Sequence, residues 1–159
     1  MIENLTWALT PPYGFYFRVF FFQSNTGTLF NTSFTQVDGL GWAYEGKPFK
    51  DSQNFRLDMP TAIKYNHIVL KSPLQPLSSQ FEAWVMRYGR QLPAMNGVKA
   101  SDTYDVTVIM QSQAQVPVSA WLCSRAYPVK ASFEGINAEN SGLVIETVEL
   151  ACNRIERKL

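Results

Sequence analysis

Residues 13–41, which read YGFYFRVFFFQSNTGTLFNTSFTQVDGLG, decide the fold class of this chain. From Tyr13 to Gln23 both alternating faces are largely apolar and rich in aromatic residues, which predicts a β-strand covered on both sides. Ser24-Asn25-Thr26-Gly27 is typical of a tight turn, because Asn and Gly tolerate positive φ angles. Leu29 to Val37 predicts a second strand, which ends at Asp38-Gly39-Leu40-Gly41. This stretch is therefore typical of a β protein.

The rest of the chain predicts six more strands from alternating apolar and polar residues. These strands are expected over residues 54–59, 65–71, 104–111, 116–125, 129–133 and 143–152. Residues 42–51 mix glycine, proline and charged residues, and we expect a loop there. Pro60 is expected to end the strand before it, because proline cannot donate a hydrogen bond to a neighbouring strand. The prediction is thus about eight strands in all.

One helix is predicted, from Ser79 to Arg90. Ser79 and Glu82 fit the capping-box pattern S-x-x-E at its start, and Gly89 is placed to end it. Four apolar side chains at helical spacing form one stripe that must dock on a sheet: Phe81, Trp84, Val85 and Tyr88. The predicted fold class is mainly β, an antiparallel β-barrel or sandwich with one flanking α-helix.

The composition favours one domain that buries part of its surface against partners. With 159 residues, we expect a single domain over 1–159, with a short flexible N-terminus over 1–11 and a flexible C-terminal tail over 153–159. Apolar residues make up 46%, which excludes a disordered chain. Charged residues make up only 17% and aromatic residues 14%, and protein interfaces have this bias.

Charge and apolar runs argue against several classes of partner. The formal net charge is +1, so no broad basic surface for nucleic acid or anionic membrane is expected. The longest apolar run, Val19–Phe22, is far shorter than the ~20 residues that span a bilayer. We find no secretory signal and expect synthesis in the cytoplasm. Cys123 and Cys152 do not form a disulfide scaffold and are expected to be reduced thiols on strands.

Residues that could carry chemistry are few. His67 is the single histidine and has no Cys, Asp or Glu at ligand-like spacing, so we expect a structural or surface residue. Glu146 and Glu149 would point to opposite faces of one strand, one solvated or between subunits and the other paired internally. Neither a nucleophile elbow nor a phosphate-binding glycine loop is present. We therefore expect no catalytic residue, no cofactor and no metal, which favours a structural or binding protein.

Four segments carry a family resemblance. Residues 11–19 (PPYGFYFRV), 34–40 (FTQVDGL), 64–71 (KYNHIVLK) and the stretch from Trp121 to Leu150 occur in this order. The helix that carries Trp84 lies between the third and the fourth. The ordered set resembles the phage tail-tube protein family of contractile tails and extracellular contractile injection systems, over about residues 15–150.

The resemblance implies a non-enzymatic building block without a cofactor. Members of the family form homohexameric rings, and the rings stack into a hollow tube inside a contractile sheath. The implied partners are neighbouring tube rings, the baseplate or hub (spike) protein and the surrounding sheath, with no specific nucleic acid and no membrane insertion. The implied location is a phage tail or a virion-like injection particle assembled after synthesis in the cytoplasm.

The resemblance also places an interface. Residues 44–61 match the family's inter-ring hairpin or loop, and mixed charges there suit contacts that fix register. An exposed hairpin with solvated charges remains the alternative. The residues expected at inter-ring or inter-subunit contacts are Tyr44, Glu45, Lys47, Lys50, Asp51, Arg56, Asp58, Arg154, Arg157 and Lys158.

Two features are more similar to tube-initiator members, which form the first ring on the baseplate. The first strand is unusually aromatic, and the chain extends past its last predicted strand into residues 154–158. The resemblance thus favours an initiator ring that joins the baseplate or hub to the tube, over a bulk tube subunit. Two other classes remain open: a small-ligand-binding β-barrel whose aromatic residues line a pocket, and an enzyme that uses His67.

Overall fold

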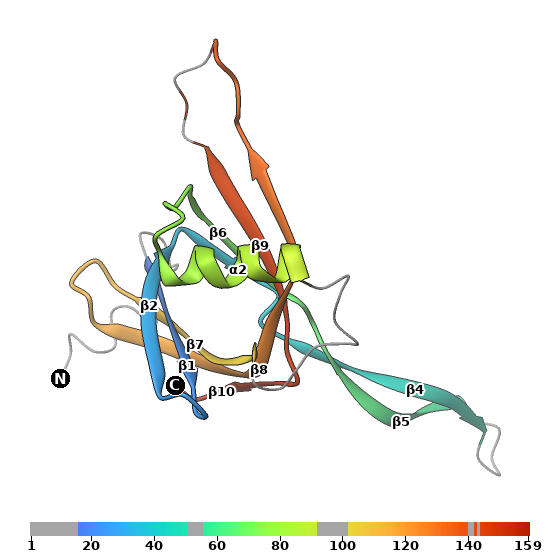
Figure 1. The fold of residues 1–159 in the computed structure, drawn as a ribbon. Coiled ribbons are helices and arrows are strands. Elements are labelled where there is room, and N and C mark those ends of the chain that lie inside the picture. Colours follow the sequence, from blue (N-terminus) through green and yellow to red (C-terminus); the bar gives the residue numbers. More distant parts are fainter. Residues whose placement is uncertain (1–15, 51–55, 92–101, 140–141, 143) are drawn as a thin grey trace.

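The computed structural model describes residues 16–50, 56–91, 102–139, 142 and 144–159, with only the backbone for 47–50, 56–61 and 91. The N-terminal residues 1–11, expected to be flexible, lie outside this range. Ten strands and one helix occur in the described residues (Figure 1). They are β1 Tyr16–Gln23, β2 Thr28–Phe34, β3 Gln36–Asp38, β4 Trp42–Lys50, β5 Arg56–Tyr65, β6 Ile68–Pro73, α2 Gln80–Gln91, β7 Tyr104–Gln111, β8 Pro117–Glu134, β9 Ile145–Ala151 and β10 Arg154–Arg157.

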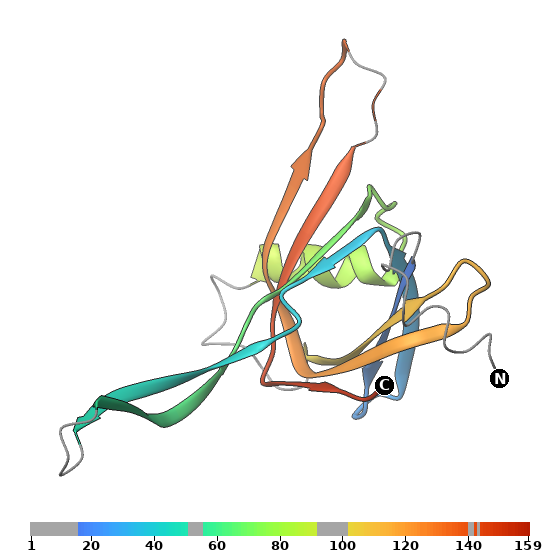
Figure 2. The same cartoon turned by 180° about the vertical axis from the view of Figure 1, so that it is seen from behind.

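The strands form an open antiparallel barrel. Their order is β2-β1-β7-β8-β9-β6-β3, with β10 paired to β8. The first part of β8 pairs with β7 and β10, whereas its second part pairs with β9, so this 18-residue strand turns the corner between two sheets. A second corner lies at Thr35, between β2 and β3, where its backbone N–H donates to the Lys71 carbonyl oxygen at 2.9 Å. Figures 1 and 2 show α2 lying across the barrel. The predicted fold class is confirmed.

The core is an aromatic cluster beneath α2. On β1, Val19 and Phe21 are fully buried, and Phe21 stacks on Phe30 of β2 with ring centroids 4.8 Å apart. From α2, Trp84 meets Phe21 edge-on at 5.8 Å. The four predicted stripe residues of α2 are all buried, which confirms the stripe: Phe81, Trp84, Val85 and Tyr88. A 12-residue helix is marginal alone, so this packing is what holds it.

Polar contacts fix both ends of α2. At its start, Ser79 Oγ accepts a hydrogen bond from the Glu82 backbone N–H at 3.1 Å, as the capping pattern predicts. The second hydrogen bond of a capping box, from the Ser79 backbone N–H to the Glu82 side chain, is not formed. The Ser79 N–H donates to the Pro76 carbonyl oxygen instead, and the Glu82 side chain is buried at 2% exposure. Gly89 does not end the helix, which runs on to Gln91. One glycine costs a helix only about 1 kcal/mol, which the buried stripe outweighs.

Several strand boundaries differ from the prediction. The expected loop over 42–51 is strand β4 as far as Lys50, and β5 continues through Pro60. The ladder shifts register there, since Glu45 pairs with Ala62 and Gly46 with Pro60. A bulge in a two-stranded sheet accommodates a proline that a central strand would exclude.

Two further predictions divide the strands differently from the structure. The expected strand over 29–37 is divided at Thr35 into β2 and β3. The expected strands over 116–125 and 129–133 are the single strand β8. Arg125 adopts φ 52°, and the pairing with β9 shifts between Pro128 and Lys130, so the strand bends where the sequence suggested a break.

The C-terminal tail, expected to be flexible over 153–159, is an ordered part of the barrel. Ile155 is 6% exposed and lies opposite Cys123 of β8. Beyond β10, the Lys158 N–H donates to the Ala120 carbonyl oxygen at 2.8 Å, and Ser119 Oγ donates to the Leu159 carbonyl oxygen at 2.7 Å. The burial of one apolar side chain and the added ladder hold the segment in place.

Gly39 sits where no side chain fits. Its φ is +83°, and a Cβ atom there would lie 2.0 Å from the His67 backbone oxygen. We expect Gly39→Ala to lower the free energy of unfolding by more than the ~1–3 kcal/mol of backbone strain alone. The matched control is Gly27→Ala, where φ is +69° but no atom lies within 4 Å. Urea unfolding compares them, and equal losses would contradict the steric account.

Candidate functional site

The β4–β5 hairpin projects from the barrel as an arm (Figures 1 and 2). In the described residues its two strands form a sheet of their own and pair with each other from Trp42–Tyr65 to Lys50–Arg56. A single two-stranded hairpin is marginally stable in water, and each of its outer edges presents unpaired backbone groups. This geometry is typical of an arm that gains stability by contacting another chain.

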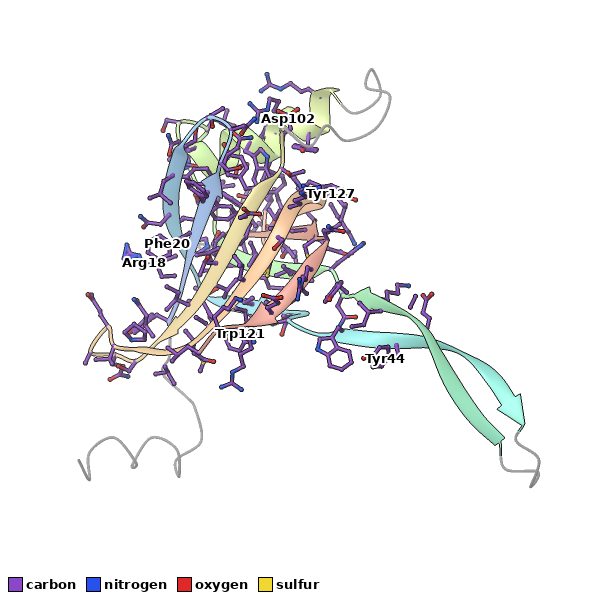
Figure 3. The ribbon with its side chains drawn as sticks, turned by 90° about the horizontal axis from the view of Figure 1, so that it is seen from below. Arg18, Phe20, Tyr44, Asp102, Trp121 and Tyr127 are labelled. Carbon is purple, nitrogen blue, oxygen red and sulfur yellow. The ribbon has the colours of Figure 1, made fainter. Side chains whose placement is uncertain are left out.

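The root of this arm carries an exposed apolar cluster, which we call the root cluster: Trp42, Tyr44 and Ile63. Their exposed fractions are 54%, 59% and 41%. The rings of Trp42 and Tyr44 lie edge to face with centroids 5.3 Å apart, and Tyr44 is directly opposite Ile63 on β5. Figure 3 shows Tyr44 at the start of the arm, away from the barrel core. Exposed aromatic groups of this kind mark protein interaction surfaces.

The structure places the predicted charged residues of the arm along its two strands. Glu45 is exposed and Lys47 and Lys50 follow it on β4, while Arg56 and Asp58 lie on β5. The backbone register puts two of these cations opposite each other, at Lys50 and Arg56. The sixth, Asp51, lies outside the described residues.

The three predicted C-terminal cations lie on a different element. Arg154 and Lys158 both form ion pairs with Glu156, the second at 2.7 Å. Arg157 sits over the ring of Trp121, 5.9 Å from its centroid, and its Nε donates to the Leu159 carbonyl oxygen. Figure 3 shows Trp121 on the outside of β8. These side chains belong to the outer wall of the barrel, on a separate element from the arm.

A second protrusion was missed at the sequence level. The ends of β8 and β9 extend beyond the barrel, at the top of Figure 1. Two apolar side chains there are 41% and 75% exposed: Phe133 and Ile136. Their sequence signal was weak, because Phe133 and Ile136 stand singly on either side of Glu134-Gly135. The φ of 82° at Gly135 marks a turn. We call this segment the upper hairpin.

The aromatic surplus of β1 divides between two faces. Phe21 points inward, whereas Arg18 and Phe20 point away from the barrel (Figure 3). Next to them, Phe22 is 42% exposed and lies opposite Leu29 of β2, which is 61% exposed. The outer face of β1 and β2 is therefore partly apolar, as for a surface that another subunit covers.

Two buried carboxyl groups face each other beneath α2. Glu82 of α2 is 2% exposed and Glu146 of β9 is 1% exposed. Burial first, and then the neighbouring Glu82 carboxyl group, raise the pKa of Glu146 from 4.5 to about 8. At neutral pH Glu146 therefore holds its proton. The enclosed position of the two groups gives them a structural role. Of the two strand glutamates, Glu146 is the one that lies inside the fold.

His67 does not lie in a strand as predicted, but between β5 and β6. Its Nδ1 is 2.7 Å from Glu149 Oε1, and the two side chains are 50% and 29% exposed. Such an exposed pair lacks the water-excluded surroundings of catalytic dyads. Among the described residues, no three His, Cys, Asp or Glu side chains gather as a metal site would require.

No helix within the described ranges is long and apolar enough to cross a bilayer.

Comparison with solved structures shows which fold this is. A chain of the sixfold-symmetrised baseplate of the anti-feeding prophage (AFP) has a TM-score of 0.73 at 18% identity, over 94% of this chain and 96% of that chain. A chain of the PVC extracellular contractile injection system, from its extended sheath–tube complex, has a TM-score of 0.73 at 17% identity, over 99% and 97%. A chain of the AFP tube-terminating cap reaches 0.66 at 17% identity, over 93% and 89%. The likeness extends over nearly the whole fold.

Sequence comparison gives the family. No curated protein sequence matches the chain. A family model for the T4-like virus tail tube protein gp19 matches residues 13–156, which include the barrel, α2 and both protrusions. The chain therefore belongs to the T4-like virus gp19 tail tube protein family.

Proposed function

We propose that this chain forms a homohexameric ring in the inner tube of a contractile injection system or phage tail. The observation that best supports this proposal is the β4–β5 arm. It is a two-stranded sheet outside the barrel, with the exposed root cluster at its base. Docked on a neighbouring subunit or ring, the arm would gain a partner for its edges and bury its aromatic side chains. The sixfold symmetry of the AFP baseplate, which contains a similar chain, supports six copies.

The remaining predicted interface residues divide between two kinds of contact in this proposal. The charged residues of the arm fix its register against the next ring, because complementary charges favour one alignment over others. The three C-terminal cations lie on the barrel wall, Arg154 and Arg157 on β10 and Lys158 just beyond it, and in this proposal they face a subunit of the same ring. The further partners are the baseplate or hub (spike) protein and the sheath, and assembly follows synthesis in the bacterial cytoplasm.

The interior of the barrel argues against the ligand-binding alternative. The aromatic side chains that would line a pocket contact one another instead, with Trp84 and Tyr104 centroids 5.0 Å apart and Phe34 and Phe81 5.3 Å apart. They fill the space beneath α2 with protein atoms. A hollow of about 310 Å³ lies beside α2, along exposed residues of β8, and not inside the barrel.

Within the tube, we propose the first ring on the baseplate. The partly apolar outer face of β1 and β2 supports this place, because an initiator contacts two unlike neighbours. The C-terminal tail no longer supports it, since β10 is part of the barrel. The AFP baseplate chain and the PVC sheath–tube chain have the same TM-score, so the likeness of fold does not choose between the two places.

The place in the tube is tested on purified particles. Antibodies against this chain, coupled to gold, are applied after the sheath is removed. If the chain forms an initiator ring, we expect label at the baseplate end alone. We also expect quantitative mass spectrometry to count six copies per particle. Label along the whole tube would instead assign the chain to the bulk tube, and no label on any part of the tube would contradict the ring itself.

A further inference from the structure

The two cysteines of the chain meet at one corner of the barrel. Cys123 lies on β8 and is fully buried, whereas Cys152 directly follows β9 and is half-buried against the same core. The chain then crosses β8: the Asn153 N–H donates to the Ser124 carbonyl oxygen at 2.9 Å, and Ile155 pairs with Cys123. This crossing brings the two thiols into hydrogen-bond contact.

The surroundings make the two thiols unequal. The Cys123 thiol donates to the Cys152 sulfur, and the Arg154 backbone N–H donates to it as well, so the pKa of Cys152 is held below its usual value. The same thiol contact, together with burial, raises the pKa of Cys123. Because the thiolate is the reactive form, Cys152 is the sulfur that reacts first with a reagent from solution.

We propose that Cys123 and Cys152 form a disulfide within the folded subunit when it meets a disulfide oxidant such as oxidised glutathione. The Cys152 thiolate attacks one oxidant sulfur, forms a mixed disulfide and releases one glutathione thiolate. Cys123 then attacks the Cys152 sulfur and its proton passes to the departing glutathione sulfur, so the second glutathione leaves as a thiol. The subunit loses two electrons and two protons, and one oxidised glutathione becomes two reduced molecules.

The bond would act as a clasp at the base of the upper hairpin. The enclosed segment, residues 124–151, contains the second part of β8 and all of β9, and β10 begins two residues after Cys152. Closing this loop restricts the unfolded chain and ties the C-terminal segment to β8. In the proposed tube, which works outside the reducing cytoplasm, the clasp would stabilise each subunit after release. This last consequence rests on the proposed function, whereas disulfide formation does not.

The test uses the full chain, purified with reductant and then incubated in oxidised or reduced glutathione. With the oxidised form we expect an intact mass lower by two hydrogen atoms, loss of both maleimide-reactive thiols after unfolding, and a melting temperature higher by about 5–10 °C. Cys152→Ser should keep its buried Cys123 thiol free, whereas Cys123→Ser should accumulate the unresolved glutathione adduct on Cys152. Neither variant should lose two hydrogen atoms or show the rise in melting temperature.

Two results would overturn the proposal. One is that both thiols remain free in oxidised glutathione, and the other is a stable glutathione adduct on Cys152 that Cys123 never resolves. The thiol readouts are made on the soluble chain, so a failure to form rings leaves them unaffected. Conversely, if rings form from a chain whose thiols never pair, the proposed function stands and the disulfide proposal fails.

Discussion

Replacing Glu146 with glutamine is expected to stabilise the protein at pH 8 by several kcal/mol. The pKa of Glu146 is about 8 in the fold and 4.5 in its ordinary state, so between these values the folded protein holds a proton that the unfolded chain has lost. The folded state therefore loses stability as pH rises, by about 1.4 kcal/mol for each pH unit across that window. A neutral amide carries no charge at any pH in this range, so Glu146→Gln removes this loss.

Unfolding in urea from pH 5 to pH 9 measures the effect. The unaltered protein should lose stability up to about pH 8 and then level off, while Glu146→Gln should show a much flatter profile. Glu149→Gln is the matched control, because Glu149 lies on the same strand but on the opposite, partly exposed side beside His67. A pH-independent profile of the unaltered protein, or a Glu146→Gln variant that is less stable at pH 8, would contradict the account in which Glu146 is buried with its proton.

Replacing both Trp42 and Tyr44 with serine should abolish ring formation and leave the fold intact. Both side chains are more than half exposed in the single subunit, so truncation removes little from its own packing. Buried at an interface, aromatic anchors of this kind are worth about 2 kcal/mol or more each. The double change should therefore weaken association by about a thousandfold or more at each contact.

Sedimentation velocity and the melting temperature together separate assembly from folding. We expect single subunits with a melting temperature close to that of the unaltered protein. The conservative control, Trp42→Phe with Tyr44→Phe, keeps two rings at the root cluster and should keep assembling. Rings from the double-serine variant would show that the root cluster is not the anchor, and a large drop in melting temperature would place these side chains in the subunit's own stability.

Local sequence patterns predicted the elements that pack one face against the core. The alternation of β1 and the stripe of α2 were found because Phe21, Trp84 and their neighbours repeat at the spacing of their own element. Elements that are stabilised mainly by pairing with another strand were harder to predict from the sequence. β4 contains Gly46 and Pro48, which oppose a strand locally, and it becomes one through its register with β5. The C-terminal tail forms strand β10 because it pairs with β8, and its short sequence alone does not predict that contact.

The candidate site shows the same division. The resemblance placed the arm at residues 44–61, but two members of the root cluster, Trp42 and Ile63, fall just outside that range. The alternation of Trp42 and Tyr44 was the available signal, and a predicted loop concealed it. The pairing of Glu82 with Glu146 was beyond local reasoning, since it joins α2 to β9 across more than sixty residues of chain. The capping pattern assigned Glu82 to the helix end instead.

The ring is the central claim, and negative-stain electron microscopy tests it most directly. The purified protein is imaged at several concentrations, alone and with the adjoining tail proteins of its particle. The account predicts six-membered rings, which stack into long tubes if the two faces are self-complementary, or form only with baseplate proteins if the faces differ. Single subunits under every condition, with no ring on any partner, would contradict it.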